Sequence, residues 1–284
     1  MTERLDETDA HIEKTDAHRE DSDAHSEDSD AHPESVVAAT EEELAAFQRR
    51  SRRSFLTFGA ATIAGVAGYK WLQGAPRDDG APWPLRRALD ASASAQRAVF
   101  GDSAKVASFS PEQARAIRVN GRYGLEGMTT PAEEWFITIQ RNAQTVTTLQ
   151  LADLMTLPKV TQTVDHKCIE GWSQVVTWSG VRMSDVIRAA EKVVGERGAH
   201  IGLVTPNLGY YVTLERSAAL HSQTLLATKL NGAVLDSGHG GPCRVAVPTR
   251  YGIKSLKRLG VINLSDEPTP DYWAERGYDR YAAF

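Results

Sequence analysis

The chain has 284 residues, 41% of them hydrophobic, which is enough to bury one good-sized core. Its net charge of −5 is unevenly distributed, because residues 1–48 hold sixteen acidic side chains against three basic ones, a net charge of −13. The remainder therefore carries +8. No nucleic-acid partner is expected.

The first 48 residues contain an internal repeat, in which Asp-Ala-His recurs every seven residues at His11, His18, His25 and His32. A seven-residue period suggests a coiled coil, but the repeat has no apolar pair to bury. Because a polar, acidic tract without aromatic residues cannot offset its chain entropy, we predict a disordered tail over residues 1–48. The alternative is that the four histidines hold zinc or nickel loosely.

Residues 49–72 resemble a twin-arginine export signal, with Ser51-Arg52-Arg53-Ser54-Phe55-Leu56 before a mildly apolar stretch. A membrane helix is the alternative, but the stretch is interrupted by Lys70 and falls short of the roughly 20 apolar residues that a span needs. Gly65-Val66-Ala67 is only a passable small-residue cleavage site, so both cleavage and an uncleaved membrane anchor stay open. This route carries folded proteins. It therefore predicts a periplasmic or extracytoplasmic protein that receives a cofactor before export.

Residues 73–117 are expected to form a linker with a helix over Leu85–Phe100, and the catalytic body is expected to begin near Arg118. Helical spacing predicts helices over Leu151–Met155 and Met183–Val194. Runs rich in β-branched and aromatic residues predict strands over Trp135–Ile139, Val160–Val164, Ile201–Thr205, Tyr210–Leu214, Leu225–Leu230, Val245–Val247 and Val261–Leu264. Strands outnumber helices and are connected irregularly, so the predicted class is α+β with mixed β-sheets.

The glycine-rich segment Gly238-His239-Gly240-Gly241-Pro242 has the wrong spacing for a dinucleotide fingerprint and a proline where the helix should begin, which argues against a nicotinamide enzyme. The chain has two cysteines, Cys168 and Cys243, and in an exported protein they could form a disulfide. Alternatively, Lys167 and His166 favour the thiolate of Cys168, which can bind a soft transition metal. One thiolate cannot hold a metal alone, so an organic cofactor would have to supply most of the coordination.

Two long motifs resemble the sulfite oxidase family of molybdopterin-dependent oxidoreductases. The first is Cys168-Ile169-Glu170-Gly171-Trp172-Ser173, followed by Trp178-Ser179-Gly180-Val181, which is similar to the family's molybdenum-ligand segment. The second comprises His239–Pro248 and Tyr251–Lys257, which are similar to its pterin-binding signature. The resemblance covers residues 118–284 and is strongest to the bacterial periplasmic single-domain branch, which includes the catalytic subunit of the methionine-sulfoxide reductase system.

This resemblance implies a sulfite-oxidase-type fold that binds molybdenum on one molybdopterin, with Cys168 as both metal ligand and catalytic residue. It further implies that the pterin or its phosphate contacts Asn120, Tyr123, Gly124, Thr205, His239, Arg244, Ser255 and Lys257, and the main chain of Leu256. From the residues alone, arginine offers a fork for phosphate and lysine a point charge. Without the motif, Arg244, Lys254 and Lys257 would be read as a solvated positive strand edge.

The C-terminal segment Trp273–Tyr278 resembles the part of the family that carries an active-site tyrosine. The resemblance implies that the phenol of Tyr278 is catalytic and donates a hydrogen bond to an oxygen ligand of the metal. Simple packing of this aromatic ring against the body is the alternative.

Animal and plant sulfite oxidases carry arginines after the metal cysteine, but here the following residues are Ile169 and Glu170. The basic sulfite clamp is therefore missing, and an acidic Glu170 would repel sulfite unless buried and paired. The family's immunoglobulin-like dimerisation domain is also missing after Tyr278, so we expect a monomer.

Together these features predict two-electron oxygen-atom transfer, with reduction of an S- or N-oxide such as methionine sulfoxide. A membrane haem protein or a c-type cytochrome is the expected electron donor. A sulfite dehydrogenase is the alternative activity. A non-catalytic envelope protein that binds a partner on the same fold is the second alternative.

Overall fold

The computed structural model describes residues 39–101, 103–126, 131–195 and 198–284. The chain divides into two compact units, Met1–Ala61 and Thr62–Phe284, which are described separately. The Asp-Ala-His repeat, with its four histidines, lies outside the described residues.

Helix α1 (Glu41–Gly74) begins inside the segment that the sequence predicts to be a disordered tail. Its start is set by a capping box: the Thr40 amide donates to the Glu43 carboxylate at 2.9 Å, and the Glu43 amide donates to the Thr40 hydroxyl at 3.3 Å. The prediction of disorder is therefore wrong for residues 41–48, because three glutamates in the first turn favour a helix start. No helix in the described ranges is long and apolar enough to cross a membrane.

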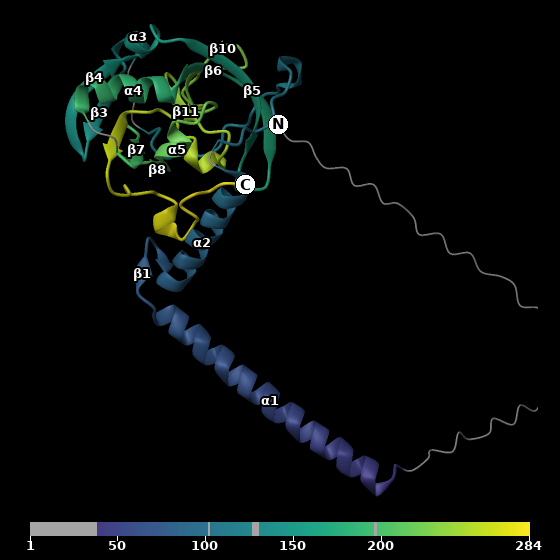
Figure 1. Ribbon diagram of the computed structural model, residues 1–284. Helices are drawn as coiled ribbons and strands as arrows, with labels where there is room; N and C mark the ends of the chain where they lie inside the picture. The colour runs from purple at the N-terminus through teal and green to yellow at the C-terminus, as the bar shows by residue number, and fades with distance from the viewer. Residues whose placement is uncertain (1–38, 102, 127–130, 196–197) are drawn as a thin grey trace, which may run out of the picture. The chain divides into compact units, whose positions relative to one another are not determined.

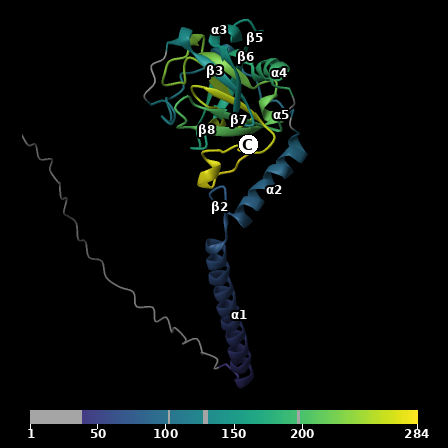
Figure 2. The same ribbon diagram turned by 90° about the vertical axis from the view of Figure 1, so that its left-hand side faces the viewer.

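Two five-stranded sheets form the body of the second unit (Figure 1, Figure 2). The first sheet has the order β4-β3-β12-β7-β8, with β12 parallel to β3 and the other pairs antiparallel. Its strands are β3 (Phe136–Arg141), β4 (Gln144–Gln150), β7 (His200–Val204), β8 (Tyr211–Glu215) and β12 (Val261–Ser265). The parallel pair within an otherwise antiparallel sheet confirms the predicted mixed sheet.

The second sheet has the order β10-β9-β6-β5, and β11 also pairs with β9. Its strands are β5 (Lys159–Lys167), β6 (Ser173–Arg182), β9 (Leu225–Leu230), β10 (Ala233–Val234) and β11 (Arg244–Ala246). Strands β5 and β6 form a long antiparallel hairpin from Lys159↔Val181 to Lys167↔Ser173, and the loop between them carries Cys168.

Helix α4 (Met183–Val194) has the bounds that helical spacing predicts, and Met183, Val186 and Ile187 on one face are fully buried. They join the main core together with side chains from both sheets. The shorter helices are α3 (Leu151–Leu154), α5 (Arg216–Ala219) and the 3-10 turns η1 (Pro111–Gln113), η2 (Ala132–Glu134), η3 (Gly252–Lys254) and η4 (Ala274–Arg276).

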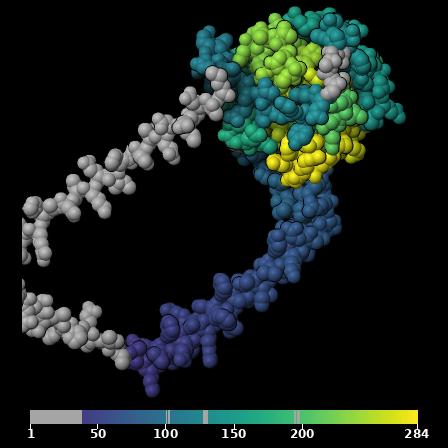
Figure 3. Space-filling view, turned by 180° about the vertical axis from the view of Figure 1, so that it is seen from behind, coloured from purple at the N-terminus to yellow at the C-terminus, as the bar shows by residue number. Residues whose placement is uncertain are grey.

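Residues 73–117 are more than a linker, since they fold as part of the second unit. The hairpin β1 (Arg77–Asp78) and β2 (Ala81–Pro82) leads into α2 (Trp83–Phe100), which agrees with the predicted helix. The fully buried Arg86 of α2 donates to the carbonyls of Ala274 and Tyr278, at 2.8 Å each. The C-terminal residues accordingly lie against the surface of α2 (Figure 3). The residues before Arg118 thus belong to the same compact unit as the predicted body.

Gly180 allows β6 and β9 to approach closely. A Cβ atom at Gly180 would lie 1.9 Å from the carbonyl oxygen of Leu226 and 2.8 Å from the Cα of Ala227. We expect Gly180→Ala to destabilise the fold by about 1–3 kcal/mol, because the strands must separate to admit the methyl group. Gly68→Ala in α1 is the control, since nothing lies within 4 Å of its added Cβ. Thermal unfolding should show a lowered midpoint for the first variant alone, and equal midpoints would refute the packing argument.

Candidate active site

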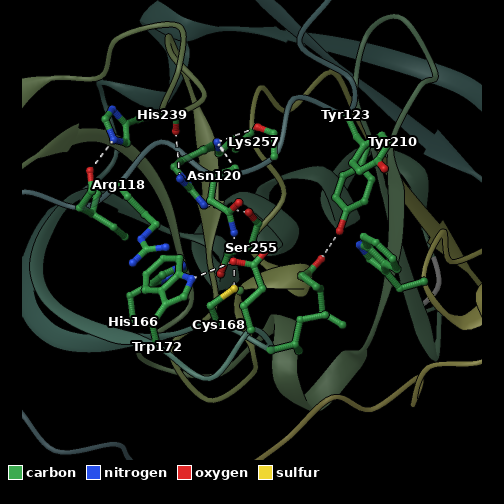
Figure 4. Close-up of a pocket in the computed structure, with 18 of the residues that line it drawn as sticks. Arg118, Asn120, Tyr123, His166, Cys168, Trp172, Tyr210, His239, Ser255 and Lys257 are labelled. Carbon is green, nitrogen blue, oxygen red and sulfur yellow. Dashed lines mark hydrogen bonds between the residues drawn. The ribbon is translucent and has the colours of Figure 1, made fainter.

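A cavity of about 340 Å³ opens beside the β5–β6 hairpin loop (Figure 4). It brings together eight of the predicted site residues: Asn120, Tyr123, Cys168, His239, Arg244, Ser255, Lys257 and Tyr278. Its wall also contains residues to which the sequence analysis assigns no cofactor contact or catalytic role, namely Ile117, Arg118, Gly121, His166, Ile169, Glu170, Trp172, Tyr210, Gly252, Ile253 and Trp273. Segments more than 160 residues apart in the sequence therefore meet at one site.

Cys168 is the first residue of the hairpin loop, directly after β5. The loop is closed by the Cys168 amide, which donates to the Trp172 carbonyl at 2.9 Å, and by the Gly171 amide, which donates to the Cys168 carbonyl at 3.2 Å. Gly171 has a φ of +84°, a conformation that favours glycine. The loop thus fixes the backbone of Cys168 and directs its side chain to the cavity.

Both cysteines are free, which rules out the disulfide alternative in this structure. Cys168 is 8% exposed, and its sulfur lies 3.5 Å from the side-chain amide nitrogen of Asn120. Cys243 is fully buried in the main core, where burial raises the pKa of its thiol to about 12. Cys168 is therefore the cysteine that faces a ligand, and Cys243 is a packing residue.

His239 and Lys257 join the loop around Asn120 to the loop before β11. The two ring nitrogens of His239 contact the Asp236 carboxylate at 2.8 Å and the Ile117 carbonyl at 3.1 Å. The Lys257 ammonium donates to the carbonyls of Asn120 at 2.6 Å and Gly238 at 2.8 Å. These contacts hold Asn120 where its side chain meets Cys168, and they show how the two residues organise the cavity wall.

Arg244 is buried, at 3% exposed, and its guanidinium donates to the carbonyls of His239 at 2.9 Å and Ser255 at 2.8 Å. The guanidinium carbon also lies 4.7 Å from the centre of the Trp178 ring. No ion pair joins Arg244 or Lys257 to an acidic side chain in the part of the chain that the structure describes. The solvated-edge alternative is thus wrong for Arg244, and two cations without acidic partners suit an anionic ligand.

The pKa shifts at this site arise mainly from burial, and neighbouring positive charge adds to them at Lys257 and His166. Burial lowers the pKa of Arg244 to about 10, and burial together with the Arg244 charge lowers the pKa of Lys257 to about 8. Burial, with the charges of Arg244 and Lys257, also lowers the pKa of His166 to about 3. An anion bound between these groups would relieve their mutual repulsion.

Ser255 and Leu256 follow η3 directly in the chain. Ser255 lines the cavity, and its hydroxyl accepts a hydrogen bond from the Val247 amide at 3.0 Å. The Leu256 side chain is fully buried in the main core, and its carbonyl accepts from the Val245 amide at 2.8 Å. Leu256 therefore does not line the cavity.

Thr205 and Gly124 also lie outside the cavity lining. Thr205 follows β7 and is fully buried, and its hydroxyl lies 3.0 Å from the Tyr210 amide, which donates to it. A Cβ atom at Gly124, whose φ is +73°, would lie 2.4 Å from the Thr205 side chain. The pair packs together behind Tyr123 and positions that loop. The structure therefore does not bring these two predicted contacts to the cavity wall.

Aromatic side chains form one side of the cavity. Tyr123 is 52% exposed and stacks near Tyr210, with ring centres 6.3 Å apart. Tyr278 is 43% exposed and packs edge-on against Trp273 at 5.0 Å. Tyr278 thus both packs against a neighbour and lines the cavity, as its predicted role requires.

Lys254, the third cation of the proposed edge, lies in the interior. It is 1% exposed, and its ammonium contacts the buried Asp271 carboxylate and the Thr213 carbonyl. Asp271 also accepts the amides of Thr213 and Ala274 at 3.0 Å each. The pair connects η3, β8 and the C-terminal segment, and so supports the cavity from behind.

Two of the omitted residues carry a signal that is visible in the sequence. His166 lies two residues before the first motif and Trp172 lies within it, and both line the cavity beside Cys168. The positions of Arg118 and Tyr210 depend on long-range folding, and no local pattern identifies them.

A family model described as the oxidoreductase molybdopterin binding domain matches residues 126–273, more than half of the chain. The protein-methionine-sulfoxide reductase catalytic subunit MsrP of Ralstonia nicotianae is 30% identical over 152 residues, covering 49% of this chain and 46% of that protein. MsrP of Xanthomonas axonopodis pv. citri is 32% identical over 130 residues, covering 42% and 40%. The sulfane dehydrogenase SoxCD of Paracoccus pantotrophus aligns in structure with a TM-score of 0.43 and 18% identity, covering 49% and 40%.

The chain spans about half the length of the curated relatives that it matches. The matched range contains Cys168 and the whole segment from His239 to Lys257, whereas Asn120, Tyr123 and Tyr278 lie outside it. The family match confirms the resemblance that the two motifs indicate and the fold that it implies. The chain belongs to the oxidoreductases with a molybdopterin-binding domain, within the sulfite oxidase family.

Proposed function

We propose that this protein binds molybdenum on one molybdopterin through Cys168 and catalyses two-electron oxygen-atom transfer. The observation that carries the proposal is one cavity in which the Cys168 thiol lies near two cations without acidic partners, Arg244 and Lys257. This combination suits a ligand that carries both a soft metal and a phosphate.

The cavity wall fits such a ligand. A Cβ atom added at Gly252 would lie 2.9 Å from the His166 ring. A Cβ atom added at Gly240 would lie 2.7 Å from the Lys257 side chain. The close approach leaves no room for a side chain at either glycine, and only Gly252 of the two lines the cavity. When bound, the molybdenum-pterin group would supply the redox chemistry. The chain would anchor it through Cys168, neutralise its phosphate and present the Tyr278 phenol at the mouth.

The proposed substrate is an S- or N-oxide such as methionine sulfoxide. In this reaction the sulfoxide takes up two electrons and two protons, its S–O bond breaks, and a thioether and water are released. An apolar thioether suits a mouth formed by Tyr123, Trp172 and Tyr278. Glu170 is exposed and not buried in an ion pair, so its negative charge remains at the cavity, where it would repel sulfite. The printed names of the MsrP relatives support the same choice.

The remaining parts of the proposal rest on the N-terminal sequence and on the resemblance. Export by the twin-arginine route, with or without an uncleaved anchor, would place the enzyme in the periplasm. Electrons would come from a membrane haem protein or a c-type cytochrome. Fusion of residues 39–74 to a reporter that folds in the cytoplasm tests the route, since replacing Arg52 and Arg53 by lysines should block its export.

An activity assay tests the substrate. Molybdenum-loaded protein should reduce methionine sulfoxide with a reduced viologen dye as electron donor, and it should not reduce cytochrome c with sulfite. The reverse result would establish the sulfite dehydrogenase instead. Absence of both activities in loaded protein would favour the non-catalytic envelope protein.

The pKa of Lys257 predicts how cofactor retention depends on pH. A phosphate favours charged lysine, and Lys257 in the cofactor-free protein has a pKa of about 8, so above this pH binding requires uptake of a proton. Affinity should therefore fall as pH rises from 8, by up to about tenfold per unit. Binding of the metal by the Cys168 thiolate alone would instead strengthen as pH rises, because the thiol must lose its proton.

The measurement is molybdenum per chain after dialysis between pH 7 and 9.5. Lys257→Met should weaken retention and remove the fall above pH 8, whereas Lys229→Met, at an exposed position of β9, should behave as the wild type. An identical profile for Lys257→Met and the wild type would contradict this role.

A further inference from the structure

Arg118 lies at the mouth of the cavity, where the family resemblance assigns no function. It lines the cavity and is exposed, and its guanidinium carbon lies 5.0 Å from the centre of the Trp172 ring. Figure 4 shows the guanidinium beside the Trp172 indole, on the same side of the cavity as Cys168. The side chain thus presents a positive charge near the proposed metal ligand.

The donors of Arg118 are available to a ligand. Within the described ranges, no ion pair or side-chain hydrogen bond is formed by Arg118, whereas Arg244 and Lys257 donate to backbone carbonyls. The nearby carboxylate of Glu170 accepts from the Trp172 indole nitrogen at 3.0 Å. An arginine stacked on an aromatic ring keeps its N–H groups directed outward in the plane, where a carboxylate can bind to two of them.

The backbone before Arg118 is held in place from three sides. The Ile117 carbonyl lies 3.1 Å from a ring nitrogen of His239. The Arg115 amide donates to the Val175 carbonyl at 3.0 Å, and its carbonyl accepts from the Asn231 side chain at 2.8 Å. Because the backbone of this segment and of the Trp172 loop is already fixed, binding a ligand there costs little conformational entropy.

We infer that Arg118 determines specificity by binding a carboxylate of the substrate. This inference rests on the proposed function and extends it: the preferred substrates are oxidised sulfur compounds that carry a carboxylate near the sulfoxide. Arg118 is exposed, whereas Arg244 is buried and Lys257 is half-buried, so we assign the rim to the substrate and the interior to the cofactor phosphate.

The test compares two substrates that differ only in this charge, N-acetylmethionine sulfoxide and its C-terminal amide. Molybdenum-loaded wild type should prefer the carboxylate in kcat/KM by about 10-fold to 100-fold, the size of a charge-assisted contact. Arg118→Gln should lose that preference through a raised KM, with the amide unaffected. Arg118→Lys should retain part of it, because the charge stays and the fork is lost.

Arg122→Gln is the matched control, since Arg122 is exposed four residues further along and does not line this cavity. A capped peptide with a glutamate next to the sulfoxide distinguishes a side-chain carboxylate from a terminal one as the natural group. Molybdenum content of each variant is measured in parallel. Loss of molybdenum in Arg118→Gln would assign Arg118 to the cofactor phosphate and overturn the inference.

Equilibrium binding separates this inference from the proposed function. N-acetylmethionine sulfone and its amide are analogues that a sulfoxide reductase is not expected to reduce. Calorimetry can therefore measure their binding affinities directly. Tighter binding of the carboxylate by wild type, lost in Arg118→Gln, would support the inference even if no sulfoxide is reduced. Equal affinities, or a preference that survives in Arg118→Gln, would overturn it even if the enzyme reduces methionine sulfoxide.

Discussion

Replacing Cys168 by serine is expected to abolish turnover and leave the fold intact. The side chain is 8% exposed at the cavity wall, and a hydroxyl is a far poorer ligand for a soft metal than a thiolate. Activity should fall by more than the roughly 10-fold to 100-fold that is typical when a residue hydrogen-bonded to a metal ligand is removed. The two side chains have nearly the same shape, so stability should change by less than about 1 kcal/mol. Viologen-coupled reduction and urea unfolding measure the two effects.

Cys243→Ala is the control for this experiment. Cys243 is fully buried in the core and does not line the cavity, so its loss should cost about 1 kcal/mol of stability and spare both molybdenum and turnover. Full activity in Cys168→Ser would exclude Cys168 as the essential ligand. Equal loss in both variants would point to damage of the fold instead.

Asp271→Ala is expected to produce the largest loss of stability among single substitutions at the site. It leaves Lys254, 1% exposed, as a buried charge and removes the acceptor of the Thr213 and Ala274 amides. Breaking a buried ion pair in this way typically costs about 3–5 kcal/mol. Urea unfolding should show this loss, and molybdenum retention should also fall, because Lys254 precedes Ser255 on the cavity wall.

Asp266→Ala is the matched control, since its ion pair with Arg141 lies at the surface and Asp266 is about half exposed. Removing this solvent-exposed ion pair should lower stability far less than Asp271→Ala does. If Asp271→Ala does not fold, the double variant Lys254→Met with Asp271→Asn decides the question, because it removes the unpaired charge. Recovery of folding in the double variant supports the argument that the unpaired charge causes the instability. If Asp271→Ala instead lowers the free energy of unfolding no more than Asp266→Ala does, that argument is refuted.

Local pattern was sufficient for the elements with a strong apolar period. Helix α4 has the predicted bounds, because Met183, Val186 and Ile187 fall on one buried face. Strand β4 was missed because most of its side chains are exposed, so that its pairing with β3 and not its own pattern keeps it in the sheet. Strand β6 was missed because its polar residues and Gly180 weaken the period-two signal.

The candidate site was predictable where a motif is continuous in the sequence. The segment around Cys168 and the segment from His239 to Lys257 both reach the cavity, as the resemblance implied. Motif position does not specify which way a side chain points, so Thr205 and Leu256 were named and lie outside the lining. The place of Arg118 follows from folding of the β5–β6 hairpin against a distant loop, which no short pattern encodes.

Metal analysis of the purified full chain tests the central claim most directly. The protein should be produced in a host that makes molybdopterin and measured together with Cys168→Ser. Wild type should contain about one molybdenum and one pterin per chain, and Cys168→Ser should contain much less molybdenum. Wild type without molybdenum from such a host, or undiminished molybdenum in Cys168→Ser, would contradict the assignment of Cys168 as the metal ligand.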